Sequence, residues 1–335
     1  MNDPFLSDFL AAGVDADEVP ELAALASARP LLDAFVTLFR GTETEVLMRL
    51  LVLREIGREA DAPRWAPEAL RARFSYLDPV KLETVLKRLR ENGLLAIGAH
   101  FLSQSMLFPR PPVKYELGPD YVQLTAPGGV KLAARHWPNP KAKYTLLYLH
   151  GNYEDLGSLN DYLPQFIAQG YAVFAFAYRR SGHSAGVPTE ANLTADASLA
   201  YDYLRTQLGV PAERIIIFGY SLGGGPGVEL ARQRPAAGLV LQGAFVSAYR
   251  VMTTIPVFPG DKFVNLAKVP HLKLPVLVIH GTADHTVPFW HGEKLYEALT
   301  ARKQRLFVEG GPHAGLADFT GPRYWEELRK FADSL

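Results

Sequence analysis

The chain has 335 residues, of which 48% are hydrophobic and 21% are charged. This composition is typical of globular proteins and excludes a mainly disordered chain. Lys and Arg number 35, and Asp and Glu also number 35, so no global field attracts the chain to nucleic acid or to an anionic membrane. Because cysteine is absent, a disulfide scaffold, a thiolate metal ligand and a thiol nucleophile are excluded.

The first ten residues, MNDPFLSDFL, lack the basic start and the apolar run of a signal peptide. No apolar run approaches the roughly 18 residues of a membrane helix. We therefore expect a cytoplasmic protein without membrane insertion. The sequence gives no indication of the oligomeric state.

Residues 1–118 have a helical pattern and are predicted to form an accessory domain. Asp78 and Pro79 begin a helix whose apolar stripe is Leu82, Val85, Leu86 and Leu89. The stretch from Thr42 to Tyr115 resembles a winged helix-turn-helix. Its third helix carries basic residues that could contact nucleic-acid phosphates, namely Lys81, Lys87, Arg88 and Arg90. The alternative is a protein–protein or lid domain with a solvated charged face.

Residues 119–335 alternate between strand-like and helical runs. Six runs are short, apolar and rich in β-branched or aromatic residues: YTLLYLH, YAVFAFAY, RIIIFGY, GLVLQGA, PVLVIHG and QRLFVEG. Strands without alternation are buried on both faces, so the pattern predicts an α/β fold with a parallel sheet between helices. The prolines within residues 109–112 predict a stiff linker between the two domains.

The strongest motif is Gly219-Tyr220-Ser221-Leu222-Gly223, which follows the run RIIIF and begins the helical stretch LGGGPGVELARQ. A serine at such a strand-to-helix turn is typical of a nucleophile elbow, which lifts the serine oxygen out of the sheet. The alternative is a glycine-rich turn with an inert serine.

A nucleophilic serine needs a base, which a carboxylate orients. Asp284 follows the strand-like run PVLVIHG, and His313 follows QRLFVEG, so both lie where strands end in a parallel sheet. The chain order Ser221, Asp284, His313 is that of a known type of catalytic triad. Other histidines compete for the role of base, but we expect His280 to be packed in the strand end, and His285 and His291 to lie on the wrong strand.

An oxyanion hole needs two backbone N–H donors. We assign one to Leu222, which follows the serine directly, and the other to Asn152 in the loop that begins His150-Gly151. His150 is expected to shape this loop rather than to act as a second base.

With these motifs the sequence resembles a known family, the α/β-hydrolase serine esterases that include the bud-emergence-type hydrolases and the protein depalmitoylases. The resemblance extends from about Tyr121 to the end and is carried by LLYLHGN, AYRRSGHSAGVPTE, GYSLGGG, PVLVIHGTADHTVPFWHGEKLYE and VEGGPHAG. It implies an eight-stranded, mostly parallel sheet and the same triad. In the loop after the fourth strand, Arg180 replaces the family's usual glycine and adds a cation near the cleft. Tyr153 and Arg180 are the candidate substrate contacts.

The sequence therefore predicts a hydrolase of carboxylic esters, with residues 119–335 as the catalytic domain. Thioesters and amides use the same triad chemistry and remain open as substrates. The reaction needs no metal and no organic cofactor, and its expected partner is a small acyl ester. The rival interpretation is a transcription regulator, in which the winged helix binds DNA and the hydrolase fold binds an ester-like effector.

Overall fold

The computed structural model describes residues 107–109, 113, 115–251 and 261–335. The predicted winged-helix-like part lies almost entirely outside these residues, as do most of the proline-rich linker and residues 252–260. The domain boundary at 118/119 and the DNA-binding helix therefore remain predictions.

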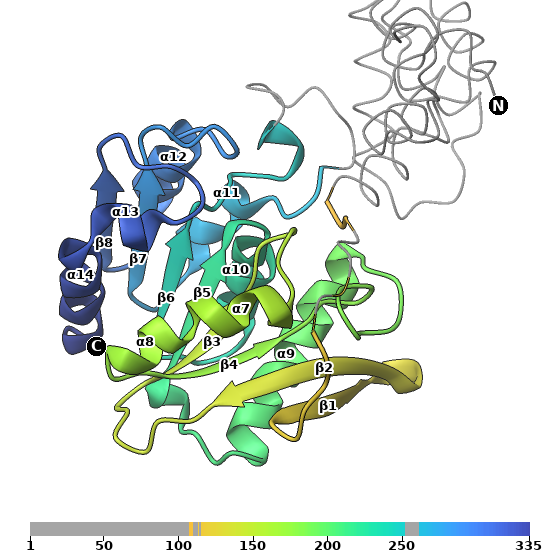
Figure 1. The fold of residues 1–335 in the computed structure, drawn as a ribbon. Helices are drawn as coiled ribbons and strands as arrows, with labels where there is room; N and C mark the ends of the chain where they lie inside the picture. The colour runs from red at the N-terminus through yellow and green to blue at the C-terminus, as the bar shows by residue number, and fades with distance from the viewer. Residues whose placement is uncertain (1–106, 110–112, 114, 252–260) are drawn as a thin grey trace, which may run out of the picture. The chain divides into compact units, whose positions relative to one another are not determined.

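The described chain forms one eight-stranded sheet in the order β1-β2-β4-β3-β5-β6-β7-β8 (Figure 1). Strands β1 and β2 form an antiparallel hairpin, β2 pairs antiparallel with β4, and all other pairs are parallel. The predicted α/β-hydrolase sheet is thus confirmed. The strands are β1 (Tyr121–Ala126), β2 (Val130–Trp137), β3 (Thr145–Leu149), β4 (Ala172–Phe176), β5 (Ile215–Tyr220), β6 (Gly238–Gln242), β7 (Val276–Gly281) and β8 (Lys303–Val308).

The burial of each strand follows from its sequence. Every residue of β3, β4, β5, β6 and β7 is buried, as continuous apolar runs require in a sheet covered on both faces. The edge strand β1 instead alternates over its second half between buried and exposed residues, because one of its faces meets water.

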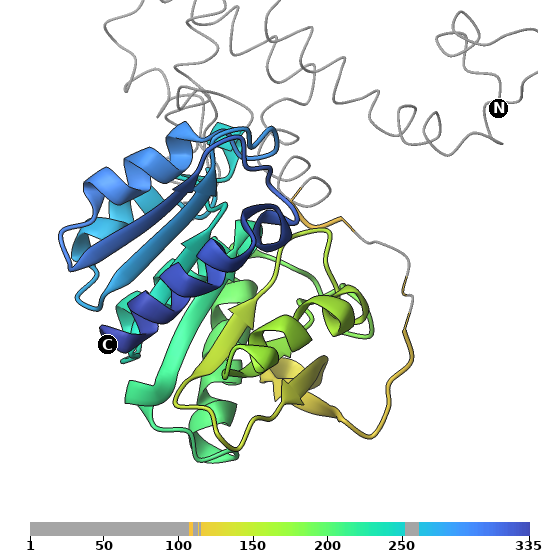
Figure 2. The same cartoon turned by 60° about the vertical axis from the view of Figure 1, so that its left-hand side comes forward.

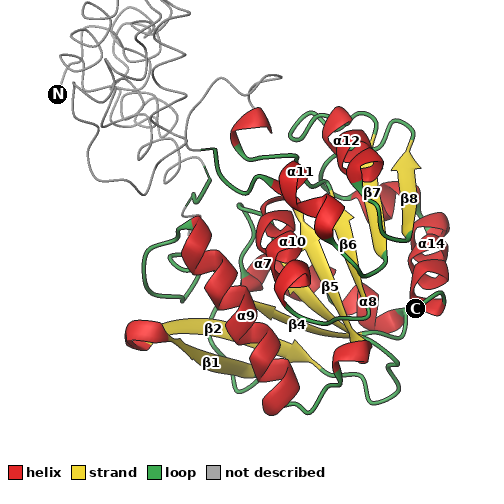
Figure 3. Cartoon of the chain, turned by 180° about the vertical axis from the view of Figure 1, so that it is seen from behind, coloured by secondary structure: helices red, strands yellow, loops and turns green. Residues whose placement is uncertain are grey.

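Helices cover both faces of the sheet. Figures 1 and 2 show α7, α8 and α14 on one face, and Figure 3 shows α9, α10 and α11 on the other. The helices are α7 (Leu156–Tyr162), α8 (Pro164–Ala168), α9 (Glu190–Thr206), α10 (Gly224–Gln233), α11 (Asn265–Lys268), α12 (Trp290–Ala298), α13 (Leu316–Thr320) and α14 (Pro322–Asp333). In α14 the buried residues recur at helical spacing, as expected of a helix with one apolar face: Tyr324, Leu328, Phe331 and Ala332.

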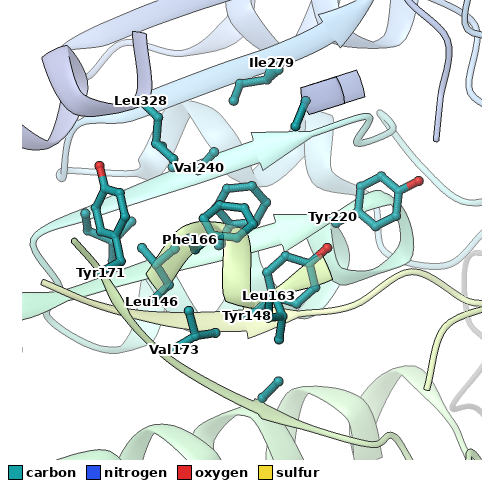
Figure 4. Close-up of a cluster of buried hydrophobic side chains, with 14 of the residues drawn as sticks. Leu146, Tyr148, Leu163, Phe166, Tyr171, Val173, Tyr220, Val240, Ile279 and Leu328 are labelled. Atoms are coloured by element: carbon teal, nitrogen blue, oxygen red, sulfur yellow. The ribbon is translucent and has the colours of Figure 1, made fainter. Parts of the chain in front are cut away.

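A cluster of large side chains fills the space between the sheet and the helices α8 and α14 (Figure 4). Phe166 of α8 is fully buried and contacts the rings of Tyr148, Phe218 and Trp325. Truncating a phenylalanine in such a core typically costs about 3–5 kcal/mol. This cluster fixes β3 and β5 relative to each other, and both strands lead directly into the candidate site.

Side-chain caps fix where the loops after β3 and β4 end. Asp155 caps α7 by accepting from the Ser158 N–H, while Ser158 Oγ accepts from the Asp155 N–H, which is a capping box. Thr189 caps α9 through the Asn192 N–H. Both loops lie at the carboxyl edge of the sheet, where ligands bind in open α/β folds.

Candidate active site

Ser221 stands at the sharp turn between β5 and α10. Its φ of 51° lies in the left-handed region, which residues other than glycine rarely adopt. The turn also needs Gly223, because a Cβ atom there would lie 1.9 Å from the carbonyl oxygen of Leu149 in β3. Such strain concentrates at functional sites, and here it places the serine at the tip of a strand–turn–helix elbow.

His313 lies between Ser221 and Asp284 and contacts both. Its Nε2 is 3.0 Å from Ser221 Oγ, and its Nδ1 is 2.6 Å from Asp284 Oδ2. An ionised carboxylate can only accept hydrogen bonds, so Nδ1 carries the proton and the Nε2 lone pair faces the serine hydroxyl. The structure therefore brings together the three residues selected from the sequence, in the arrangement of a nucleophile, a base and an orienting acid.

Asp284 is buried after β7 and accepts hydrogen bonds at both carboxylate oxygens. Backbone N–H groups of Thr286 and Val287 donate to Oδ1 over 2.9 and 2.7 Å, whereas His313 contacts Oδ2. Burial alone would raise the pKa of Asp284, but the hydrogen bonds from His280, His313 and Val287 hold it well below its usual range. The group is therefore ionised and keeps the His313 imidazole in one tautomer.

The three competing histidines occupy different environments. His280 is fully buried, and its Nε2 donates to the Val287 carbonyl over 2.8 Å while lying 3.3 Å from Asp284 Oδ2. His291 is also fully buried and accepts at Nδ1 from the Val246 N–H, and burial lowers its pKa to about 3. His285 is exposed. Of the four histidines, His313 is the one that reaches both Ser221 and Asp284.

His150 anchors the loop after β3. Its side chain is buried and stacks on Tyr178 with ring centroids 3.9 Å apart. His150 Nδ1 lies 2.7 Å from the Gly151 carbonyl oxygen, and its Nε2 accepts from the Tyr178 N–H over 3.4 Å. These contacts define a neutral imidazole with the proton on Nδ1, and burial lowers its pKa to about 4. His150 is thus built into the loop, as expected from the sequence.

The two residues proposed for the oxyanion hole lie in the loop after β3 and in the elbow itself. Asn152 is the second residue of the turn Gly151–Glu154, which the Glu154 N–H closes by donating to the Gly151 oxygen over 3.3 Å. Leu222 follows Ser221 directly in a 3-10 turn, η4 (Ser221–Gly223), and is buried.

The two candidate substrate contacts lie in the loops after β3 and β4. Tyr153 is 72% exposed, although large aromatic side chains are usually mostly buried. Arg180 is exposed and has a φ of 68°, so it adopts the conformation that favours the glycine expected at this position. Its neighbour Arg179 is buried and forms a two-point ion pair with Asp196 of α9, which anchors the loop.

Three residues near the site were not assigned a role there from the sequence. Tyr220 lies within the elbow motif and stacks on His313, and Glu154 binds the loop after β3. His280, expected only to be packed, also lies beside Asp284. A carboxylate directly after the loop motif HGNY was a signal for Glu154. The contact of Tyr220 with His313 spans 93 positions, and that of His280 with Asp284 depends on the course of the loop after β7.

Within the described residues, no group of three or more His, Cys, Asp or Glu side chains could hold a metal ion. No helix in the same part of the chain is both long enough and apolar enough to cross a membrane.

Comparisons with known proteins identify the family of this chain. Residues 140–259 match the family model of serine aminopeptidases, S33. The chain is 37% identical over 199 residues to alpha/beta hydrolase domain-containing protein 17B of Homo sapiens, and the match covers 58% of this chain and 67% of the human protein. The chain belongs to the α/β-hydrolase family. It is also 38% identical over 204 residues to alpha/beta hydrolase domain-containing protein aho-3 of Caenorhabditis elegans, covering 58% of this chain but only 59% of that relative.

Solved structures of other proteins share the fold of this α/β-hydrolase. The Pyrococcus furiosus esterase Pf2001 matches with a TM-score of 0.58 at 18% identity, covering 68% of this chain and 97% of the esterase. The esterase RhEst1 from Rhodococcus matches with a TM-score of 0.51 at 20% identity, covering 64% of this chain and 99% of that one. At these identities the likeness concerns the fold.

Proposed function

We propose that this α/β-hydrolase cleaves carboxylic esters through an acyl-enzyme on Ser221. The observation that carries the proposal is the continuous hydrogen-bonded line from Ser221 Oγ through the His313 imidazole to the buried Asp284 carboxylate. The strained elbow supports the same assignment, because it presents the hydroxyl at the carboxyl edge of the sheet.

In the first half of the reaction, Ser221 Oγ attacks the carbonyl carbon of the ester while His313 Nε2 takes the hydroxyl proton. Asp284 stabilises the imidazolium that forms and does not itself take the proton. The carbonyl oxygen becomes negative and accepts hydrogen bonds from the Asn152 and Leu222 N–H groups, whose stabilisation is strongest in the transition state. His313 then protonates the leaving alkoxide as the ester C–O bond breaks.

In the second half, water attacks the acyl carbon while His313 Nε2 takes a proton from it. Collapse of the tetrahedral intermediate breaks the bond to Ser221 Oγ, which recovers its proton from His313, and the carboxylic acid leaves. All steps use side chains, backbone donors and water. The same sequence of proton transfers would cleave a thioester, in which sulfur replaces oxygen as the leaving atom. Only an experiment can therefore distinguish these two substrate classes.

Tyr153 and Arg180 are proposed as contacts to the parts of the substrate that do not react. A tyrosine that is mostly exposed supplies an apolar ring with a polar edge. The Arg180 guanidinium would favour a substrate with an anionic group, because a carboxylate or phosphate matches its planar donors. The expected partner is therefore a small acyl ester.

The test is labelling with a fluorophosphonate, followed by hydrolysis of a panel of p-nitrophenyl esters and matched acyl thioesters. The wild-type protein should be labelled once, at Ser221, and should hydrolyse at least one acyl chain length. Ser221→Ala should lose labelling and about 10⁶ in turnover while remaining folded. Ser198→Ala, a serine of α9 remote in sequence from the elbow, is the matched control and should keep both. A labelled Ser221→Ala protein, or one that keeps more than a few per cent of the activity, would overturn the proposal.

A further inference from the structure

Glu154 binds both polar groups of the Gly151 backbone. The Gly151 N–H donates to Glu154 Oε2 over 2.7 Å, and the Glu154 N–H donates to the Gly151 oxygen over 3.3 Å. The Glu154 carbonyl in turn accepts from Ser181 Oγ over 3.3 Å, which ties the turn to the loop after β4. One residue thus closes the turn Gly151–Glu154 by its backbone and by its side chain.

These two hydrogen bonds between Glu154 and Gly151 fix the direction of the N–H group that follows Gly151. In a trans peptide the C=O and the following N–H point in opposite directions. The Gly151 oxygen is held on the inner side of the turn by Glu154 N–H and by His150 Nδ1, so the Asn152 N–H lies on the outer side. We propose that Glu154 is a positioning residue, whose carboxylate holds Gly151 so that the Asn152 N–H meets the negative oxygen of the reacting ester. This inference rests on the proposed function.

The position of Gly151 couples this turn to the base. A Cβ atom on Gly151 would lie 3.1 Å from Tyr220 Cε1 and 3.3 Å from Glu154 Oε2, so the Gly151 backbone comes close to both the tyrosine ring and the carboxylate and leaves little room for a side chain. The other side of this link is the stacking of Tyr220 on His313. A shift of the turn would therefore displace Tyr220 in the elbow and, through it, His313, in addition to moving the Asn152 N–H.

The surroundings of the Glu154 carboxylate are tyrosines from four segments around it. Tyr148 of β3, Tyr162 of α7, Tyr178 after β4 and Tyr220 of β5 all interact electrostatically with it. His150 and Asp155 adjoin the same turn, and no Lys or Arg of the described residues forms an ion pair with Glu154. Burial raises the pKa of Glu154 from 4.5 to about 7, and the Gly151 N–H opposes that rise. The carboxylate form is the stronger acceptor for Gly151, so the hold on the turn strengthens as pH rises through this range.

The experiment compares wild type with Glu154→Gln, which keeps an acceptor oxygen but loses the charge, and with Glu154→Leu, which loses both. Glu213→Gln, at an exposed position before β5, is the matched control and should behave as wild type. Each protein is assayed with one p-nitrophenyl ester from pH 5 to pH 9, and its unfolding temperature is measured at pH 5 and pH 8.

We expect kcat to fall about tenfold in Glu154→Gln and about 100-fold in Glu154→Leu at pH 8. KM should change little, because a misplaced oxyanion donor weakens the stabilisation of the transition state rather than the binding of the substrate. In wild type, kcat/KM should gain an additional factor of about ten as Glu154 loses its proton around pH 7, because the protonated carboxyl holds Gly151 no better than a glutamine does. In both variants this additional rise should be absent. A role in folding alone would not remove this rise from the pH profile.

The stability of the same variants should change in the opposite direction to activity. A carboxyl whose pKa is raised on folding costs stability as pH rises from the unfolded value of 4.5 to about 7. Glu154→Gln should therefore unfold at a higher temperature than wild type at pH 8 and show a smaller gain at pH 5. A variant that is both more stable and slower identifies a residue retained for positioning.

The outcomes separate this inference from the function on which it rests. If wild type is not labelled at Ser221 and hydrolyses no ester, the proposed function fails. If wild type is active but its pH profile has the same shape as that of Glu154→Gln, or if Glu154→Gln keeps wild-type kcat, the function stands and the role of Glu154 is overturned.

Discussion

The ring of Tyr220 stacks on the imidazole of His313 with their centroids 5.3 Å apart, and the Tyr220 hydroxyl donates to the His313 carbonyl oxygen over 3.3 Å. The residue before the nucleophile thus supports the base at two points. Burial raises the pKa of Tyr220 well above its usual value, so the hydroxyl keeps its proton and remains a donor at neutral pH.

Tyr220→Phe should slow ester hydrolysis by about two- to tenfold, because it removes one hydrogen bond of about 0.5–1.5 kcal/mol and keeps the stacked ring. Tyr220→Leu should slow it further, since the imidazole loses its aromatic support as well. The measurement is kcat together with the rate of fluorophosphonate labelling. Tyr203→Phe, where the ring stacks on Phe174, is the control and should leave both rates unchanged. Equal rates for Tyr220→Leu and wild type would show that the stack does not position His313.

The fold and the three central site residues could be predicted because they depend on local patterns. Strands buried on both faces need apolar residues throughout, and parallel strands bring their carboxyl ends to one edge. Ser221, Asp284 and His313 each follow such a strand, so their meeting required no knowledge of packing. Their catalytic roles remain predictions that the mutations described here test.

Other features of the site could not be predicted because they depend on contacts between residues distant in sequence or on the exact course of a loop. The neutral form of His150 follows from burial against Tyr178, 28 positions away, and the hold of Tyr220 on His313 spans 93 positions. The closeness of His280 to Asp284 follows from the course of one loop, in which Val287 returns to bind both residues. A motif fixes residue types and spacing but not these side-chain directions.

Asp284→Asn should leave the fold intact and lower turnover by about 10⁴, because an amide can donate to His313 Nδ1 and so stabilise the wrong tautomer. His313→Ala should be comparably damaging. The measurement is kcat with an ester of known response, and the exposed His285→Ala is the matched control. Should His285→Ala prove the more harmful change, the base has been assigned to the wrong histidine.

Because His291 is buried, we expect the free energy of unfolding to decrease in acid. Its pKa is lowered on folding from 6.5 to about 3, so the unfolded chain takes up a proton that the folded protein does not. The corresponding stability is complete above pH 6.5 and is lost as pH falls from 6.5 towards 3, by about 2 kcal/mol at pH 5.

His291→Asn tests this effect, because its amide oxygen can accept from the Val246 N–H in place of Nδ1 but does not titrate. The free energy of unfolding is measured in urea at pH 8 and pH 5. The variant should be less stable than wild type at pH 8 and should lose less stability on acidification. The same loss in both proteins would rule out His291 as a source of the acid sensitivity.

Arg180→Gly should separate strain from substrate binding. Glycine adopts a φ of 68° without the cost of about 1–2 kcal/mol that other residues incur there, although its freer unfolded chain returns part of that gain. We expect a variant that is as stable as wild type or slightly more stable. If Arg180 contacts an anionic substrate group, kcat/KM for a half-ester of a dicarboxylic acid should fall about tenfold relative to a neutral ester of the same length. An unchanged ratio would remove Arg180 from the substrate contacts.

Tyr115 decides where a truncated hydrolase should begin. Its ring stacks on Tyr121 with centroids 5.6 Å apart and meets the edge of His183 at 4.9 Å, and His183 Nε2 lies 2.8 Å from the Tyr115 carbonyl oxygen. Burial raises the pKa of its hydroxyl to about 12. Tyr115 thus packs against the hairpin strand β1 and the loop after β4, although it precedes the predicted boundary at 118/119.

A protein of residues 113–335 should therefore fold and keep Ser221 reactive toward a fluorophosphonate. A protein of residues 119–335 should also be reactive but less stable by about 1–2 kcal/mol, the contribution of one partly buried aromatic side chain. Tyr115→Ala in the full chain should cost a similar amount, which separates the loss of this ring from the loss of the preceding residues. The measurements are urea unfolding and labelling of each protein. If the protein of residues 113–335 is insoluble or unreactive, the residues before 113 belong to the catalytic fold, and the prediction of two separable domains is wrong.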